Sequence, residues 1–184
     1  SHRPLATEIG RVCGVRTLAL EYRLAPESPF PAAVEDAVAG YRFLLSCGIE
    51  PGHIAVAGDS AGGGLTVALM VSARESGLPQ PACGWCISPW VDLECLGPSM
   101  SNKADVDPLI QKPYLKELAQ AYLQGADPRT PLAAPLYASL KGLAPLLIHV
   151  GSAETLLDDA VRLANVAGAA GVAVTLEIWP DMIH

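Results

Sequence analysis

The stretch Gly58-Asp59-Ser60-Ala61-Gly62 decides the fold of this chain. It follows an apolar run over 54–57, typical of a short buried strand, and precedes a run of small and apolar residues over 63–71, typical of a helix. A serine between two glycines, at a turn from strand to helix, is held above the edge of a sheet. The glycines allow the sharp turn, because they adopt backbone angles that other residues avoid. The pattern predicts an accessible Ser60 hydroxyl and a free Ala61 N–H at the start of the helix.

The G-x-S-x-G pattern by itself is weakly specific, since a chain with 17 glycines contains such matches by chance. The alternative is an ordinary glycine-rich turn in which the serine only caps a helix. The strand before the motif and the helix after it favour a nucleophile at Ser60. The remainder of the chain has to separate these two interpretations.

Length and composition predict one globular domain over 1–184. The chain has 184 residues, of which 51% are hydrophobic and 17% charged, so it can bury a sizeable core. Its net charge is −7 and it contains no Lys/Arg cluster, which argues against a nucleic-acid partner. No apolar run approaches the length of about 18 residues that a membrane-spanning helix needs.

The five cysteines, an odd number, lie at positions 13, 47, 83, 86 and 95. Cys83 and Cys86 have C-x-x-C spacing, but they fall inside a predicted strand rather than at the start of a helix. We therefore expect buried free thiols instead of a redox pair or a zinc site, and no bound metal. Free thiols are typical of a reducing compartment, so we expect a cytoplasmic location.

Apolar runs and helix-spaced segments alternate along the chain, with proline and glycine between them. Strands are predicted at 16–22, 54–57, 82–88, 145–150 and 172–178, and helices at 4–13, 32–46, 63–76, 114–123 and 158–168. Residues 23–31 hold three prolines and are predicted to be a rigid loop. Residues 89–143 hold seven prolines and are predicted to be an irregular insertion around one helix, lining or covering the site at one end of the sheet.

The alternation of strands and helices predicts an α/β fold, a mostly parallel sheet with helices on both faces. Sites in such sheets lie beyond the carboxyl ends of the strands. Ser60, Glu154 and His184 each follow a predicted strand. The three residue types of nucleophilic acyl chemistry are therefore expected at one edge, in the chain order serine, acid, histidine.

A serine hydroxyl needs a base to take its proton during attack, and histidine is the usual base. His184 follows the last predicted strand and is the favoured base for Ser60; its alternative is a frayed terminal residue. His149 lies inside a strand, His53 opens a strand at the opposite end of the sheet, and His2 lies at the start of the chain. These three positions fit structural or surface roles better.

A carboxylate that orients the histidine completes the set, and two candidates remain. Glu154 lies in a loop, four residues after the strand that ends at Val150. Asp158 lies beside Asp159 where a helix begins, a position that helix capping explains well. We favour Glu154 as the acid, although spacing alone leaves Asp158 open.

Five segments together resemble the hormone-sensitive-lipase-like branch of the α/β-hydrolase esterases, over essentially the whole chain. They are Tyr22–Glu27, Phe30–Ala33, Gly58–Gly63, Ser88–Leu93 and Gly151–Asp159. The resemblance implies the α/β-hydrolase fold and the hydrolysis of carboxylic esters with short to medium acyl chains, through an acyl-enzyme. It implies no cofactor.

The resemblance also implies roles for matching positions. Ser60 corresponds to the nucleophile, His184 to the base and the Ala61 N–H to one oxyanion donor. The family's acid opens an Asp-Pro-Leu-x-Asp segment, so the acid falls on Glu154 and the second, structural aspartate on Asp158.

The expected substrate contacts lie beside the nucleophile and beyond a strand exit. Asp59 precedes Ser60, and the segment with Trp90, Val91 and Leu93 is expected to line the acyl pocket. The expected partner is therefore a small-molecule ester. A homodimer of the full-length protein is left open.

The chain departs from the family at its ends. The family's further oxyanion donors come from a His-Gly-Gly-Gly loop that is absent here. The chain begins without methionine, inside a predicted helix, and ends at His184 directly after a strand and a turn. We therefore expect a fragment that lacks the N-terminal strands, the oxyanion loop and the C-terminal helix. Losing one oxyanion donor typically costs on the order of 10²–10³ in rate, so the fragment is expected to be weakly active at best.

Three alternatives remain. An amidase or a deacetylase would use the same side chains, and only a substrate profile separates it from a carboxylesterase. A catalytically silent, receptor-like binding protein of this branch lacks the base, so the presence of His184 with Ser60 and Glu154 argues against it. A redox or metal function would require Cys83 and Cys86 to be exposed together.

Overall fold

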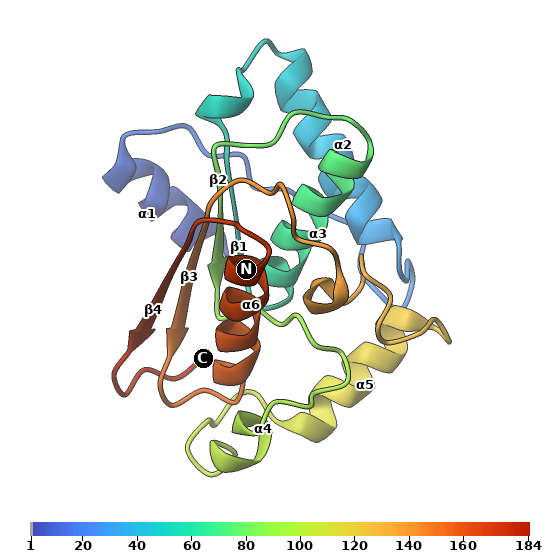
Figure 1. Ribbon diagram of the computed structural model, residues 1–184, viewed down its shortest axis with the longest axis vertical. Coiled ribbons are helices and arrows are strands. Elements are labelled where there is room, and N and C mark those ends of the chain that lie inside the picture. Colours follow the sequence, from blue (N-terminus) through green and yellow to red (C-terminus); the bar gives the residue numbers. More distant parts are fainter. Residues whose placement is uncertain (1) are drawn as a thin grey trace.

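The computed structural model describes residues 2–184 and contains, within them, a sheet of four parallel strands (Figure 1). The strands lie side by side in chain order: β1 (Ala55–Asp59), β2 (Cys83–Ile87), β3 (Leu146–Gly151) and β4 (Val174–Trp179). All three pairings are parallel, with Asp59 opposite Ile87 and Ile87 opposite His149. The carboxyl ends of the strands therefore meet at one edge, and the predicted parallel α/β sheet is confirmed.

The helices lie where the sequence predicts them, within two residues at each end. They are α1 (Arg3–Cys13), α2 (Ala32–Ser46), α3 (Ala61–Glu75), α5 (Lys112–Leu123) and α6 (Leu157–Ala169), together with the single turn α4 (Ser99–Asn102) and the 3₁₀ turns Pro51–His53 and Pro135–Tyr137. Residues 23–31 contain no helix or strand, as their prolines predict. Between β2 and β3, α5 is the one long helix of the described chain.

The predicted strand over 16–22 is wrong. A strand needs a hydrogen-bonded neighbour, and within residues 2–184 the exposed edge of β1 has no partner. Residues 16–21 are exposed, and their apolar side chains lie beside α2 instead. Leu18, Leu20 and Phe43 line a hollow there of about 460 Å³.

The main core lies between one face of the sheet and the helices α3 and α6. Buried side chains from all three layers pack together: Val67, Met70 and Val71 of α3, Cys86, Leu146, Ile148 and Val150 of the strands, and Ala160, Leu163 and Ala167 of α6. The helix α3 connects β1 to β2, and α6 connects β3 to β4, in the same direction across the sheet. Both connections are expected to be right-handed, so both helices lie on the same face of the sheet. A smaller cluster of Ala37, Tyr41, Ile54, Leu69 and Ala73 packs α2 against α3.

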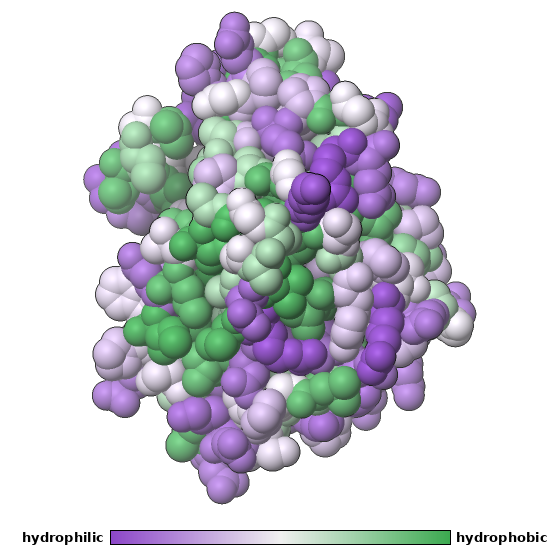
Figure 2. Space-filling model, in the orientation of Figure 1, coloured by the Kyte–Doolittle hydropathy of each residue, from purple (hydrophilic) through white to green (hydrophobic). Residues whose placement is uncertain are grey.

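The opposite face of the sheet is only partly covered in the described residues. Trp85, His149 and Trp179 form a row across it, with edge-to-face contacts of 5.6 and 6.0 Å between ring centroids. The helix α1 lies apart from α3 and α6 (Figure 1) and buries none of its residues. Figure 2 shows hydrophobic surface over β3 and β4.

The two cysteines with C-x-x-C spacing do not face each other. Residues three apart on a strand point to opposite faces, so Cys83 is half-buried on one side of β2 and Cys86 is fully buried on the other. Burial raises the pKa of the Cys86 thiol to about 12. Paired redox or zinc chemistry at these thiols is therefore disfavoured. None of the helices in the described chain combines the length and the apolar character that crossing a membrane requires.

Candidate active site

Ser60 lies at the turn between β1 and α3 with a backbone conformation that few non-glycine residues adopt. Its φ is 56° and its ψ is −117°. Four backbone hydrogen bonds hold it there. Its N–H donates to the Ile87 carbonyl at 2.9 Å, and its carbonyl accepts from Gly63 at 2.9 Å, from Gly64 at 3.2 Å and from Trp90 at 3.0 Å. Backbone strain of this kind persists where the surroundings enforce it, and it gathers at functional sites. This geometry disfavours the alternative of an ordinary capping serine.

Three of the four glycines around Ser60 are required by close contacts, and Gly62 is the exception. A Cβ atom on Gly58 would overlap the carbonyl group of Gly62, and one on Gly64 would overlap the carbonyl oxygen of Trp90. A Cβ on Gly63 would lie 2.8 Å from the side chain of Pro89. The start of α3 can therefore approach both β1 and the segment after β2 only because these positions lack side chains.

The Ala61 N–H is the first amide of α3, and Ala61 is exposed. The first amides of a helix have no partner inside it, and this N–H has no other acceptor among the residues that the structure describes. It is therefore free to donate to a group above Ser60, as its predicted role requires.

The structure pairs His184 with Glu154 rather than with Asp158. Glu154 follows β3 and is 2% exposed; its Oε2 lies 2.9 Å from His184 Nδ1. Its Oε1 accepts hydrogen bonds from the Ser88 hydroxyl at 2.7 Å and from the Gly151 N–H at 2.6 Å. Asp158 instead accepts a hydrogen bond from the backbone of Ser99 at 2.5 Å. The geometry thus favours Glu154 as the residue that orients the histidine.

The charges of three carboxylates act on the His184 imidazole, and Glu154 is the one in contact with it. Burial alone would lower the pKa of His184, but the hydrogen bond and charge of Glu154 outweigh it, with smaller contributions from Asp59 and Asp107, and the pKa is raised. No hydrogen bond joins Ser60 to His184 within residues 2–184. Such bonds are often long in a free enzyme and shorten when substrate binds.

The other histidines have different partners. His149 accepts a hydrogen bond from the Trp85 indole at 3.3 Å and lies 3.2 Å from Glu177, on the face of the sheet away from α3. The sequence did not indicate that His2 lies beside the turn at Ser60, yet its Nε2 lies 2.9 Å from Asp59 Oδ2. Asp59, predicted to contact substrate, is therefore held by His2.

The predicted substrate-contacting segment after β2 is mostly buried. Trp90 and Leu93 pack in a cluster with Met100, and Val91 packs in the main core with no exposed surface. The prediction that Val91 contacts substrate therefore needs correction, because its side chain is buried in the main core and packs there. Trp90 and Leu93 lie between the nucleophile turn and the insertion, and their contact with an acyl group stays a prediction.

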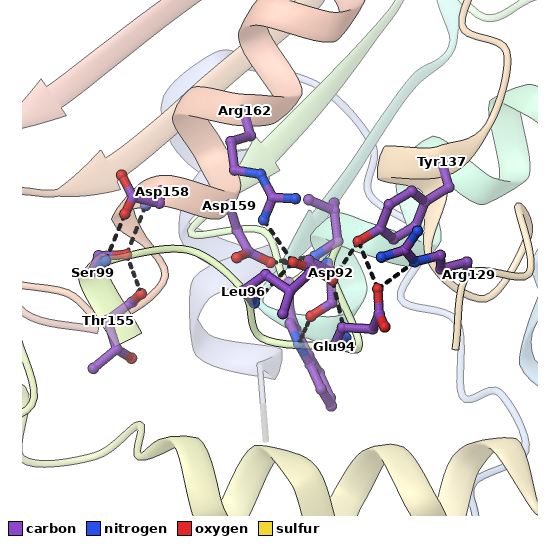
Figure 3. Close-up of polar contacts among 12 residues, drawn as sticks. Asp92, Glu94, Leu96, Ser99, Arg129, Tyr137, Thr155, Asp158, Asp159 and Arg162 are labelled. Atoms are coloured by element: carbon purple, nitrogen blue, oxygen red, sulfur yellow. Dashed lines mark hydrogen bonds and ion pairs between the residues drawn. The ribbon is translucent and has the colours of Figure 1, made fainter. Parts of the chain in front are cut away.

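A polar network fixes this segment to α6 (Figure 3). Asp159 Oδ2 accepts the backbone N–H groups of Val91 and Asp92 at 3.0 and 2.9 Å. Asp92 in turn contacts Arg162 at 2.6 Å and accepts the Tyr137 hydroxyl at 3.0 Å. Asp159 and Arg162 of α6 therefore position the segment that packs against Ser60.

Two further buried residues that sequence reasoning missed hold the loop of Glu154. One is Ser88, described above. The other is Asp107, 1% exposed, which accepts the Thr155 N–H at 2.9 Å and the Ile110 N–H at 3.0 Å. No local pattern marks them, because each acts across a long stretch of chain. In residues 2–184 no group of three or more His, Cys, Asp or Glu side chains is arranged to hold a metal ion.

Comparison with known proteins identifies the family of this chain. The model of a family described as having an alpha/beta hydrolase fold matches residues 1–184. The chain belongs to the α/β-hydrolase fold family. A solved structure described as an esterase from the bacterial hormone-sensitive lipase family superposes with a TM-score of 0.98 and is 54% identical over all of this chain and 62% of its own. The resemblance to the hormone-sensitive-lipase-like branch of the α/β-hydrolases is thereby confirmed.

Curated relatives of this α/β-hydrolase carry related names. An acetyl-hydrolase of Streptomyces hygroscopicus is 52% identical over 184 residues, which are 100% of this chain and 62% of the relative. The carboxylic ester hydrolase LipN of Mycobacterium tuberculosis is 35% identical over all of this chain and 52% of its own length. This chain thus spans between half and two thirds of these relatives.

Proposed function

We propose that this α/β-hydrolase is a serine carboxylesterase with Ser60 as nucleophile, His184 as base and Glu154 as the acid. The observation that supports this most is the pairing of His184 Nδ1 with Glu154 Oε2, at the same sheet edge as the strained Ser60. Ser60, Glu154 and His184 come from distant parts of the chain, and each follows a strand at the edge where a parallel sheet usually has its active site.

The arrangement suits acyl transfer in two steps. His184 Nε2, the ring nitrogen that faces away from Glu154, takes the Ser60 proton as Oγ attacks the ester carbonyl. The Ala61 N–H donates to the oxyanion that forms. Collapse of this intermediate releases the alcohol, which receives the proton from His184, and leaves an acyl group on Ser60. Water, activated by the same histidine, then releases the acid.

The proposed substrates are carboxylic esters with short to medium acyl chains. The name of the Streptomyces relative, an acetyl-hydrolase, supports this size. So does a solved relative, EstE5, that is 54% identical to this chain and whose crystal was soaked with p-nitrophenyl butyrate. The cytoplasmic location and the homodimer stay predictions from the sequence.

The test is the hydrolysis of p-nitrophenyl butyrate by the full-length protein and by its Ser60→Ala variant. We expect Ser60→Ala to lose turnover to the background, a loss on the order of 10³-fold or more. The matched control is Ser46→Ala, because Ser46 is an exposed serine at the end of α2 that bonds only its own helix. This control should keep full turnover. Equal turnover in the protein and in Ser60→Ala would overturn the proposal and favour a binding protein on the same fold.

A further inference from the structure

Ser88 is a buried serine in a backbone conformation that normally favours glycine. It follows β2 directly, is 6% exposed and has a φ of 41°. Its N–H donates to the carbonyl of His149 at 2.7 Å, which ties it to β3. A non-glycine residue in the left-handed region bears a cost, and such residues gather where the side chain has a task.

The Ser88 side chain contacts the carboxylate that faces the proposed base. Its hydroxyl donates to Glu154 Oε1 at 2.7 Å, and the Gly151 N–H donates to the same oxygen. Two donors on Oε1 prevent the carboxylate from rotating, so Oε2 stays directed at His184. Glutamate has one more rotatable bond than aspartate, so fixing its carboxylate costs more side-chain conformational entropy. The hydrogen bond from Ser88 therefore restricts a carboxylate that would otherwise sample more orientations than that of an aspartate.

The segment that begins with Ser88 also contacts the nucleophile turn. The Trp90 N–H donates to the Ser60 carbonyl at 3.0 Å, and Pro89 packs on Gly63. One short stretch of backbone therefore touches Ser60 on one side and Glu154 on the other. The distance between the two halves of the proposed triad depends on this stretch.

We propose that Ser88 is a positioning residue, whose hydroxyl fixes the carboxylate of Glu154 so that its second oxygen holds the His184 ring in place. The effect of Ser88 on catalysis rests on the proposed function, whereas its effect on the His184 ring does not. Ser88 itself touches neither substrate nor the reacting atoms.

The first test is the titration of His184 by NMR in the protein, in Ser88→Gly and in Ser88→Ala, with His184→Gln used to assign the signal. Glycine adopts the positive φ freely, so Ser88→Gly removes the hydroxyl without straining the backbone. The charged groups that face this ring are Glu154, Asp59 and Asp107. Losing one donor leaves more negative charge on Glu154, so we expect the pKa of His184 to rise by on the order of half a unit in both variants.

Ser99→Ala is the matched control. Ser99 is as buried as Ser88, and its hydroxyl donates to the carbonyl of Thr155, next to Glu154, but not to the carboxylate. Losing the Ser99 hydroxyl should loosen the loop of Glu154 and leave the pKa of His184 unchanged. An unchanged pKa in Ser88→Gly, or an equal shift in Ser99→Ala, would overturn the positioning role.

The second test is a double-mutant cycle on ester hydrolysis. Ser88→Gly should lower kcat about tenfold with little change in KM, the size expected for one hydrogen bond to a charged group. In a Glu154→Gln background the same change should cost almost nothing, because the carboxylate it holds is gone. Additive losses would contradict the proposal. Failure of the esterase function would appear separately, as equal turnover in the protein and in Ser60→Ala, while the titration would still decide the role of Ser88.

Discussion

Arg162 on α6 reaches back to Asp92 in the segment after β2, with Nη1 2.6 Å from Oδ2 (Figure 3). Asp92 has no exposed surface, and it also accepts the backbone N–H groups of Glu94 and Leu96 at 3.0 Å. This pair joins the last helix to the segment that packs on the nucleophile turn. The position of Trp90 against Ser60 therefore depends on contacts made far from the proposed reaction.

Asp92→Ala should destabilise the fold by about 3 kcal/mol, because it leaves Arg162 and the partly buried N–H groups of Glu94 and Leu96 without their acceptor. Urea unfolding followed by circular dichroism measures this. Glu75→Ala is the control, since Glu75 pairs with Arg74 on the surface at 3.5 Å and should change stability by less than about 1 kcal/mol. Equal effects of the two substitutions would contradict the structural role of Asp92.

Asp159 should make stability fall as the pH rises. Burial raises the pKa of Asp159 to about 7, although the N–H groups of Val91 and Asp92 act in the opposite direction. Its Oδ1 has no partner in the described part of the chain. The unfolded value is about 3.9, so between that pH and about pH 7 the folded state binds more protons than the unfolded state. The contribution of Asp159 to the free energy of unfolding is therefore fully present below about pH 4 and is lost as the pH rises to about 7.

The check is the free energy of unfolding at pH 5 and pH 8 in the protein and in Asp159→Asn. Asparagine mimics the protonated carboxyl and does not titrate, so the variant should lose less stability between pH 5 and pH 8. The difference between the two proteins isolates Asp159 from the other titrating groups. A parallel pH dependence in both would show that Asp159 does not titrate in this range.

Glu154→Gln should change both the rate and the pH dependence of ester hydrolysis. The raised pKa of His184 places the acidic limb of kcat/KM above the usual histidine value, and activity rises with pH as the ring loses its proton. Removing the carboxylate leaves burial to dominate, so the limb should move to lower pH. The loss in kcat should be on the order of 10⁴-fold, as for other triad acids.

Asp158→Asn separates the two acid candidates in the same assay. Asp158 holds the backbone of Ser99 and does not contact His184, so its replacement should reduce stability while the acidic limb stays in place. A loss of turnover in Asp158→Asn as large as that in Glu154→Gln, with a shifted limb, would reverse the assignment.

Gly64→Ala should destabilise the protein by about 1–3 kcal/mol, because the added methyl group overlaps the carbonyl oxygen of Trp90. Gly62→Ala is a matched control in the same turn of α3, since its added Cβ meets nothing within 4 Å. There the higher helix propensity of alanine should raise stability by up to about 1 kcal/mol. The melting temperatures of both variants measure this difference. Equal changes in melting temperature would show that the close contact of Gly64 with Trp90 does not decide the effect on stability.

Much of the α/β-hydrolase architecture could be predicted from local sequence. The alternation of apolar and helix-spaced segments predicted all the helices of more than one turn and four strands within two residues, because burial on a parallel sheet imposes those patterns. The apolar centre of residues 16–22 predicted a strand that does not form. Strand formation depends on a hydrogen-bonded neighbour, which no local pattern reports.

The chain by itself determined the sharp turn at Ser60, since Ser60 and its glycines form a local motif between a strand and a helix. It also determined the order of serine, acid and histidine along the strands. Only the tertiary structure decided between Glu154 and Asp158, and only it showed Ser88 beside the carboxylate. A hydrogen bond forms between atoms within about 3 Å, and whether residues 66 positions apart come that close depends on how the whole sheet is assembled.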